Sequence, residues 1–259
     1  MKALYDQIST LSMKQMDGAL LSIAILQEAE TMKVENIPDL QEAIALAAYL
    51  HRNDTRANRG NLPRDTYITH PLRNTLRIMR YYNVTDPDIL IASVLHDTVE
   101  DHPDEIVQKI IGQDIEGLSE EEIRMRAITF ISGRFGAEVA RIVLAVSNPL
   151  YQPGEQLTKA QKRERYAHHI EEVIANDYPV MVVKFADFYD NAGSLHHTMG
   201  NKGMTEHLVQ KYTPIIEIFR KYFPVIENHM SDHGQFRFTL HLMRVQGRLD
   251  ALSKGESIY

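Results

Sequence analysis

The chain of 259 residues contains no cysteine. This absence excludes disulfides, zinc–thiolate sites and cysteine nucleophiles. The sequence also lacks any run close to the ~18 consecutive apolar residues of a membrane span. Its first residues lack the apolar core of a signal peptide. We therefore expect a cytoplasmic protein that makes no membrane contact.

Excess positive charge is absent as well, since the net charge is −7, which argues against a general nucleic-acid binder. The apolar share of 44% and the charged share of 24% are ordinary for a globular protein. A chain of this length can bury a sizeable core in one domain. Because there are twelve histidines and no cysteine, imidazole nitrogen and oxygen are the expected metal ligands.

Positive charge is nevertheless concentrated in residues 51–80, which hold seven arginines against two aspartates, a local net charge of +5. On charge alone, this stretch fits a solvated helix face as well as a cradle for a small polyanion. Its arginines are Arg52, Arg56, Arg59, Arg64, Arg73, Arg77 and Arg80.

Apolar residues recur at three- and four-residue spacing along most of the chain, and this spacing predicts amphipathic helices. Ser119 followed by Glu122 is a capping-box pattern, which predicts a helix start. A stretch with proline and glycine predicts a loop over 148–158. Because no strand alternation is visible, we expect an all-α fold. Other helices are predicted over residues 20–29, 40–50, 69–82, 137–146, 166–175, 180–195, 206–222 and 236–252.

The most apolar predicted helix starts near residue 85 and leads into the sequence His-Asp-Thr-Val-Glu-Asp at 96–101. On a continuous helix, one imidazole and three carboxylates of this segment fall within an arc of about 140°. Carboxylates this close repel one another unless a cation or a shared proton relieves them. Acids at a helix C-terminus also oppose the helix dipole, which disfavours a solvated acidic end. The segment therefore predicts a divalent metal site around His96, Asp97, Glu100 and Asp101.

Two other segments carry polar residues that fit the same site. In Tyr-Ile-Thr-His-Pro at 67–71, His70 stands at a predicted helix start. In a second strongly apolar predicted helix, Asp187 shares one face, within about 100°, with Asn191 and Ser194. A buried aspartate needs a cation or hydrogen-bond donors. Taken alone, each of these residues fits a structural role better than a metal-binding one.

Taken together, the segments resemble the HD phosphohydrolase superfamily, in which a histidine, a His-Asp pair and a later aspartate on separate helices bind a metal. More closely, the sequence resembles the hydrolase domain of the RelA/SpoT family and the small alarmone hydrolases. The resemblance extends from about Ala47 to about Leu195. It is carried by His51 and the basic residues after it, by Tyr-Ile-Thr-His-Pro at 67–71, by His-Asp-Thr-Val-Glu-Asp at 96–101, and by Val-Lys-Phe-Ala-Asp at 183–187 with Asn191.

This resemblance implies an HD-domain helical bundle that hydrolyses the alarmone (p)ppGpp at its 3′-pyrophosphate, giving GDP or GTP and pyrophosphate. One divalent metal, manganese, would be the cofactor, although nitrogen and carboxylate ligands suit iron or zinc as well. Glu100 and Asp101 would handle the attacking water. The implied metal ligands are His70, His96, Asp97 and Asp187. The implied substrate contacts are Arg56, Arg59, Lys184, Asn191 and Ser194.

We expect three regions along the chain: an N-terminal helical extension at 1–35, the HD hydrolase domain at 36–224, and a C-terminal helical extension and tail at 225–259. The expected partner is a small-molecule nucleotide, with no nucleic acid, and the oligomeric state is left open. The chain departs from the family at Arg56, because alanine follows it where the family usually has lysine.

Two other functions stay open at this point. One is another HD enzyme, either a nucleoside monophosphatase or a phosphodiesterase, which the released product would distinguish. The other is a nucleotide sensor without catalysis. The intact Glu100 and Asp101 count against a sensor, because a pure binder needs no acid that activates water. The sequence does not distinguish guanine from adenine as the preferred base.

Overall fold

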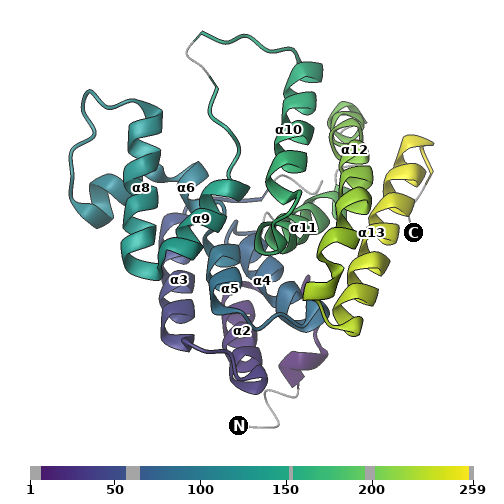
Figure 1. Ribbon diagram of the computed structural model, residues 1–259, viewed down its shortest axis with the longest axis horizontal. Helices are drawn as coiled ribbons and strands as arrows, with labels where there is room; N and C mark the ends of the chain where they lie inside the picture. Colours follow the sequence, from purple (N-terminus) through teal and green to yellow (C-terminus); the bar gives the residue numbers. More distant parts are fainter. Residues whose placement is uncertain (1–6, 57–64, 152–153, 196–201, 257–259) are drawn as a thin grey trace. The chain divides into compact units, whose positions relative to one another are not determined.

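Helices make up the regular structure of the computed structural model, which describes residues 7–56, 65–151, 154–195 and 202–256 (Figure 1). Within these ranges, extended backbone pairs only at an isolated bridge between Thr55 and Thr66. The predicted all-α fold class is therefore confirmed. Among the helices described, none is both long and apolar enough to cross a bilayer.

The chain folds as two compact units. The first unit holds the described residues up to Ser147, apart from Tyr81–Asn83. The second unit holds Tyr81–Asn83 and the described residues from Asn148 onward. The expected division at residues 35 and 224 stays a prediction.

The first unit is built around α5, in which every residue from Ile89 to Leu95 is buried. Helices α3 and α9 pack directly against α5, while α2 packs on α3 and α8 packs on α9 (Figure 1). A central position suits a helix that is apolar nearly all round. The elements are α2 (Gly18–Met32), α3 (Ile37–Leu50), α4 (Thr69–Tyr82), α5 (Pro87–Leu95), α6 (Thr98–Asp101), α7 (Pro103–Glu105), the π-helical η1 (Ile106–Ile111), α8 (Glu120–Phe135) and α9 (Ala137–Val146).

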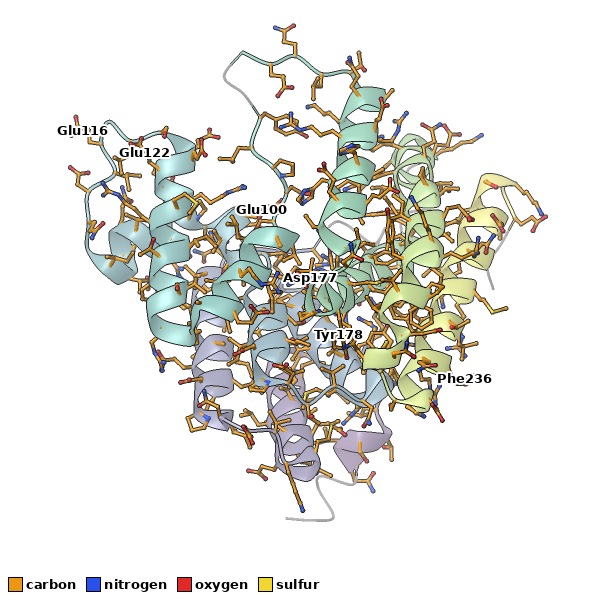
Figure 2. The ribbon with its side chains drawn as sticks, in the orientation of Figure 1. Glu100, Glu116, Glu122, Asp177, Tyr178 and Phe236 are labelled. Carbon is orange, nitrogen blue, oxygen red and sulfur yellow. The ribbon has the colours of Figure 1, made fainter. Side chains whose placement is uncertain are left out.

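The start of α8 follows the capping-box prediction. The Ser119 hydroxyl accepts a hydrogen bond from the Glu122 amide at 3.3 Å, and the Ser119 amide donates to the Glu122 carboxylate at 2.8 Å. Figure 2 shows Glu122 in the first turn of this helix. Each contact satisfies a backbone amide that has no partner inside the helix. A local sequence pattern is thus enough to position this helix end.

The end of α5 differs from the prediction of one continuous helix through residue 101. The helix ends at Leu95, and α6 begins at Thr98 after a turn. In this turn the His96 ring donates from Nδ1 to the Ser93 carbonyl at 2.8 Å, and the Thr98 hydroxyl donates to the Leu95 carbonyl at 2.7 Å. Because side chains take these carbonyls, the helical ladder is interrupted. The 140° arc calculated for an unbroken helix therefore does not apply.

The second unit is formed by α10, α11, α12, η3 and α13. Helix α11 is almost entirely buried and packs against α10, α12 and α13. Aromatic rings fill the space between them, with Phe185 of α11 stacked on Phe238 of α13 at a centroid distance of 3.6 Å. The elements are α10 (Lys159–Ile174), α11 (Tyr178–Ala192), α12 (Lys202–Ile226), the 3-10 turn η3 (Glu227–His229) and α13 (Asp232–Ser253).

Two phenylalanines on α13 offer a matched test of this packing, because Phe238 is fully buried whereas Phe236 is 63% exposed (Figure 2). Phe238→Ala leaves a cavity beside Phe185, so we expect the free energy of unfolding to fall by about 3–5 kcal/mol. Phe236→Ala should change it by less than about 0.5 kcal/mol. Urea denaturation followed by circular dichroism measures both values, and equal losses would contradict the packing described here.

Candidate metal centre

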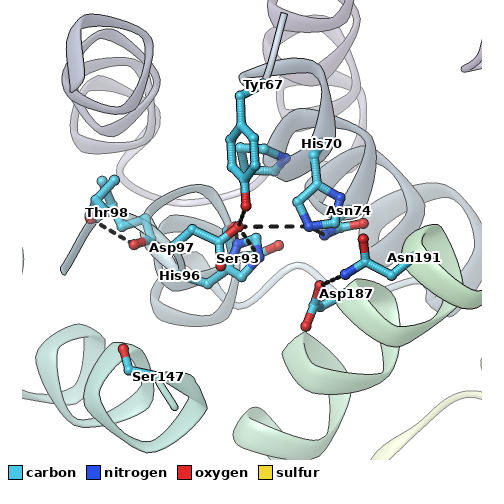
Figure 3. A network of polar contacts seen from close by, with 12 residues as sticks. Tyr67, His70, Asn74, Ser93, His96, Asp97, Thr98, Ser147, Asp187 and Asn191 are labelled. Atoms are coloured by element: carbon cyan, nitrogen blue, oxygen red, sulfur yellow. Dashed lines mark hydrogen bonds and ion pairs between the residues drawn. The ribbon is translucent and has the colours of Figure 1, made fainter. Parts of the chain in front are cut away.

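Three of the four predicted metal ligands come together in the first unit (Figure 3). His70 lies in the first turn of α4, while His96 and Asp97 form the turn between α5 and α6. Asp97 Oδ2 lies 3.1 Å from His96 Nε2 and 3.7 Å from His70 Nε2. Two imidazoles and a carboxylate that converge in this way can hold a divalent metal ion.

Neighbouring groups orient the two imidazoles toward Asp97. Because His96 donates from Nδ1 to the Ser93 carbonyl, its Nε2 carries a lone pair on the side of Asp97. The Asn74 amide lies 3.4 Å from His70 Nε2, where it can donate to the lone pair that a metal would otherwise use (Figure 3). The contact to Ser93 therefore gives His96 the form that binds a metal.

Tyr67 adds a direct contact to Asp97 that the sequence did not reveal. Its hydroxyl donates to Asp97 Oδ2 at 2.8 Å (Figure 3). Burial raises the pKa of Tyr67, and the negative charge of Asp97 raises it further, so the phenol stays protonated as a donor. Tyr67 belongs to the motif at 67–71, but only the folded chain shows which carboxylate it reaches.

The charge on Asp97 is stabilised by these neighbours. Burial alone would raise the pKa of Asp97, but the positive charge that His96 and His70 carry when protonated, with the hydrogen bond from the Tyr67 hydroxyl, holds it well below its usual range. The carboxylate is therefore ionised at any physiological pH. An ionised oxygen beside two imidazole nitrogens suits a cation such as manganese, iron or zinc.

The predicted fourth ligand, Asp187, belongs to α11 in the second unit. It is buried, and Asn191 Nδ2 donates to its Oδ1 at 2.6 Å while Lys184 Nζ lies 3.5 Å from its Oδ2. The Ser194 hydroxyl donates to the Asp190 carbonyl at 2.6 Å. Asn191 and Lys184, which were expected to contact substrate, therefore contact Asp187. The role of Asp187 as a metal ligand stays a prediction.

The two acids expected to handle water lie on α6, one turn after Asp97. Partial desolvation, together with the charges of Asp97 and Glu100, raises the pKa of Asp101 to about 7. Glu100 acts electrostatically on Arg124, a buried side chain of α8 that the sequence analysis did not single out. The mutual repulsion of these acids is the feature that a bound cation would relieve.

The described arginines of residues 51–80 do not all line one surface for a small polyanion, which their charge had made possible. Arg52 pairs with Glu105 at 2.6 Å, and Arg80 pairs with Glu28 at 2.6 Å. Arg73 and Arg77 are buried, and Arg56 lies over the Tyr67 ring at 5.6 Å. Arg59 and Arg64 lie outside the described residues. Several of these charges therefore hold the first unit together, and they were not foreseen in that role.

An all-α fold that brings a histidine at one helix start beside a His-Asp pair at the end of another fits the class of HD-type metal-dependent phosphohydrolases. No family model matches the chain. It is similar to the guanosine-3′,5′-bis(diphosphate) 3′-pyrophosphohydrolase MESH1 of mouse and of human, with 28% identity over 173 residues in each case. These matches cover 67% of this chain and 78% of each relative.

The zebrafish MESH1 is 27% identical over 173 residues, which cover 67% of this chain and 77% of the relative. A solved structure, described as a metazoan ortholog of SpoT that hydrolyses ppGpp, is similar with a TM-score of 0.43 and 19% identity. That match covers 71% of this chain and 94% of the other, but it is too distant to support a conclusion. The three MESH1 relatives confirm the resemblance to alarmone hydrolases that the motifs predicted.

Replacing Asp101 by asparagine should change how the stability of the metal-free protein depends on pH. Because folding raises the pKa of Asp101, its stabilising contribution is fully present below about pH 4 and is lost as the pH rises toward about 7. Near pH 8 we expect Asp101→Asn to be more stable than the wild type by roughly 1–2 kcal/mol. This value is smaller than the full shift implies, because the side chain is exposed.

The measurement is urea unfolding of EDTA-treated wild type and Asp101→Asn at a series of pH values. The two proteins should be equally stable near pH 4 and should diverge as the pH rises. A saturating divalent metal should reduce the difference, because a cation relieves the repulsion among the acids. A difference that does not change with pH would show that Asp101 has no raised pKa.

Proposed function

We propose that this chain is a metal-dependent hydrolase that removes pyrophosphate from the 3′ position of (p)ppGpp and leaves GDP or GTP. The observation that carries the proposal is the convergence of His70, His96 and Asp97, with Glu100 and Asp101 one turn away. The similarity to MESH1, whose name states this activity, supports the choice of substrate. A small nucleotide is therefore the proposed partner.

Manganese is the proposed metal, and the proposed ligands are His70, His96, Asp97 and Asp187. The donor set fits, because two imidazole nitrogens and carboxylate oxygens suit a borderline divalent ion. When bound, such an ion supplies a water of lowered pKa and stabilises charge on phosphoryl oxygens. The Asn191 amide would then orient Asp187, since it already donates to one of its oxygens.

Glu100 and Asp101 are proposed to position the attacking water and to accept its proton. Their place on the short helix α6 separates them from the metal ligands in the preceding turn. A carboxyl group whose pKa is raised toward 7, as that of Asp101 is, can exchange a proton near neutral pH. Arg124, which interacts electrostatically with Glu100, would balance the charge of that carboxylate.

Substrate binding is proposed to involve arginine and other polar side chains. Arg56 would contact the base or the phosphates; its guanidinium lies over the Tyr67 ring, and a planar cation suits phosphate. Arg59 would add a second positive charge. The buried Lys184 would hold Asp187 and balance its charge, while Asn191 and Ser194 would face the nucleotide. The cytoplasmic location expected from the sequence also stays a prediction.

The substrate is tested by incubating the purified protein with manganese and ppGpp, and in parallel with GMP. We expect pyrophosphate and GDP from ppGpp and little free phosphate from GMP. Asp97→Asn is the matched inactive control, because it differs by one atom in the carboxyl group. Phosphate release from GMP with ppGpp left intact would favour a nucleoside monophosphatase. Binding of ppGpp without turnover of either compound would favour a sensor.

Glu100→Gln separates water activation from metal binding. The amide is nearly isosteric, and four proposed metal ligands remain, so the metal content should stay unchanged. The turnover number should fall by about 10²–10⁴-fold, which is the usual contribution of general acid–base assistance. Substrate affinity should be equal or higher, because one negative charge near the phosphates is removed.

Asp97→Asn should behave differently, because it removes a ligand. We expect both the metal and the activity to be lost, with partial recovery at high manganese concentration. Metal content per chain and turnover are measured side by side for the two variants. If Glu100→Gln lost its metal as readily as Asp97→Asn, Glu100 would be a ligand. Full activity of Glu100→Gln would exclude it from the mechanism.

A further inference from the structure

A second histidine–aspartate cluster, outside the proposed catalytic ligand set, lies in the first unit. His51 follows the last residue of α3, Asp54 lies in the next turn, and His102 joins α6 to α7. Asp54 Oδ2 lies 2.9 Å from His51 Nδ1 and 2.6 Å from His102 Nε2. The two ring nitrogens are 3.2 Å apart. Three potential ligand atoms therefore meet at one point.

The spacing of these atoms resembles one face of a metal-ligand tetrahedron. Zinc binds imidazole nitrogen and carboxylate oxygen at about 2.0–2.2 Å, so tetrahedral ligands lie about 3.3–3.5 Å apart. The distance between His51 and His102 nearly matches this value, and the two distances to Asp54 need to lengthen by only about 0.5–0.8 Å. In the candidate metal centre, the corresponding distances from Asp97 are 3.1 and 3.7 Å.

We propose that His51, Asp54 and His102 form a second site for a divalent metal of the zinc class. The side chain of His51 is fully buried, whereas those of His102 and Asp54 are 19% and 34% exposed. The cluster is thus closed behind His51 and reaches solvent at Asp54. Water can therefore supply the fourth ligand that three side chains leave to be filled.

The surroundings of the two imidazoles suit this role. Glu105 Oε2 lies 4.0 Å from His102 Nδ1, the nitrogen that faces away from the cluster, and Arg52 pairs with the other oxygen of Glu105 at 2.6 Å. A carboxylate that accepts a hydrogen bond from the other ring nitrogen is the usual support for a metal-binding imidazole, and Glu105 at 4.0 Å would have to move closer to His102 to form it. Burial lowers the pKa of His51, so the ring is neutral near pH 7, as a ligand must be.

The second site would act on the first through Tyr67. The Tyr67 ring stacks on His51 with centroids 4.6 Å apart, while its hydroxyl donates to Asp97 at 2.8 Å. A metal that immobilises His51 would therefore hold Tyr67 against the carboxylate of the candidate metal centre. We assign the second metal a structural role, because none of the acids proposed to handle water belongs to its ligand set.

The competing arrangement is a metal-free network in which both imidazoles donate to the same oxygen of Asp54. Metal stoichiometry distinguishes the two. We would strip the full-length protein with EDTA, titrate it with Zn²⁺ by calorimetry, and measure bound zinc after gel filtration. The wild type should bind two equivalents, whereas Asp54→Asn and His102→Gln should each bind one. His168→Gln replaces an exposed histidine that pairs with Glu172, and this matched control should bind two.

A doubly substituted protein, His70→Ala with Asp97→Asn, tests the second site by itself. It should retain one equivalent of zinc, and X-ray absorption should show two imidazole ligands on that ion. Retention by this protein would support the second site even if ppGpp proved not to be the substrate, because hydrolysis is not measured. No bound zinc in this protein, or equal binding by the wild type and Asp54→Asn, would overturn the proposal and leave the hydrogen-bond network.

Discussion

The carboxylate of Asp97 lies next to the end of the apolar helix α5, and polar side chains of the first unit gather around it. Tyr67, His96 and His70 approach one oxygen of this carboxylate at 2.8, 3.1 and 3.7 Å. A poorly hydrated carboxylate is costly unless donors or a cation compensate it. Because Tyr67 and His70 come from the start of α4, these contacts tie that start to the end of α5, the central helix of the unit.

The turn after Leu95 separates the predicted metal ligands of this centre from the acids proposed to handle water. If α5 continued as one helix, the ligands and the acids proposed to handle water would share a single rigid face. The side chains of His96 and Thr98 instead bind backbone carbonyls, and the helix is interrupted. His96 and Asp97 thus sit in the turn, while Glu100 and Asp101 start from a separate helix. Side-chain hydrogen bonds to these carbonyls therefore place the predicted metal ligand Asp97 and the acids proposed to handle water on adjacent but separate segments.

Local patterns in the sequence were sufficient for several helix limits, although not for the end of α5. The capping box at Ser119 and the limits of α4 agree with expectation. Caps and apolar spacing act within one or two turns of a helix, so neighbouring residues determine them. The motifs at 67–71 and 96–101 also supplied the residues that meet in space, His70, His96 and Asp97, and carboxylates gathered at a helix end repel one another unless a cation or a shared proton relieves them.

Contacts between distant residues were decided only by the tertiary structure. Asp54 meets His102 across 48 positions, Arg52 meets Glu105 across 53, and Tyr67 meets Asp97 across 30. The periodicity of the sequence around these residues does not specify their partners. Polar groups form hydrogen bonds and ion pairs with whichever groups folding brings close to them, however distant these are along the chain. The sequence by itself therefore determined the helical class and the residue types of the candidate centre. Packing decided which carboxylate each imidazole, phenol and guanidinium contacts.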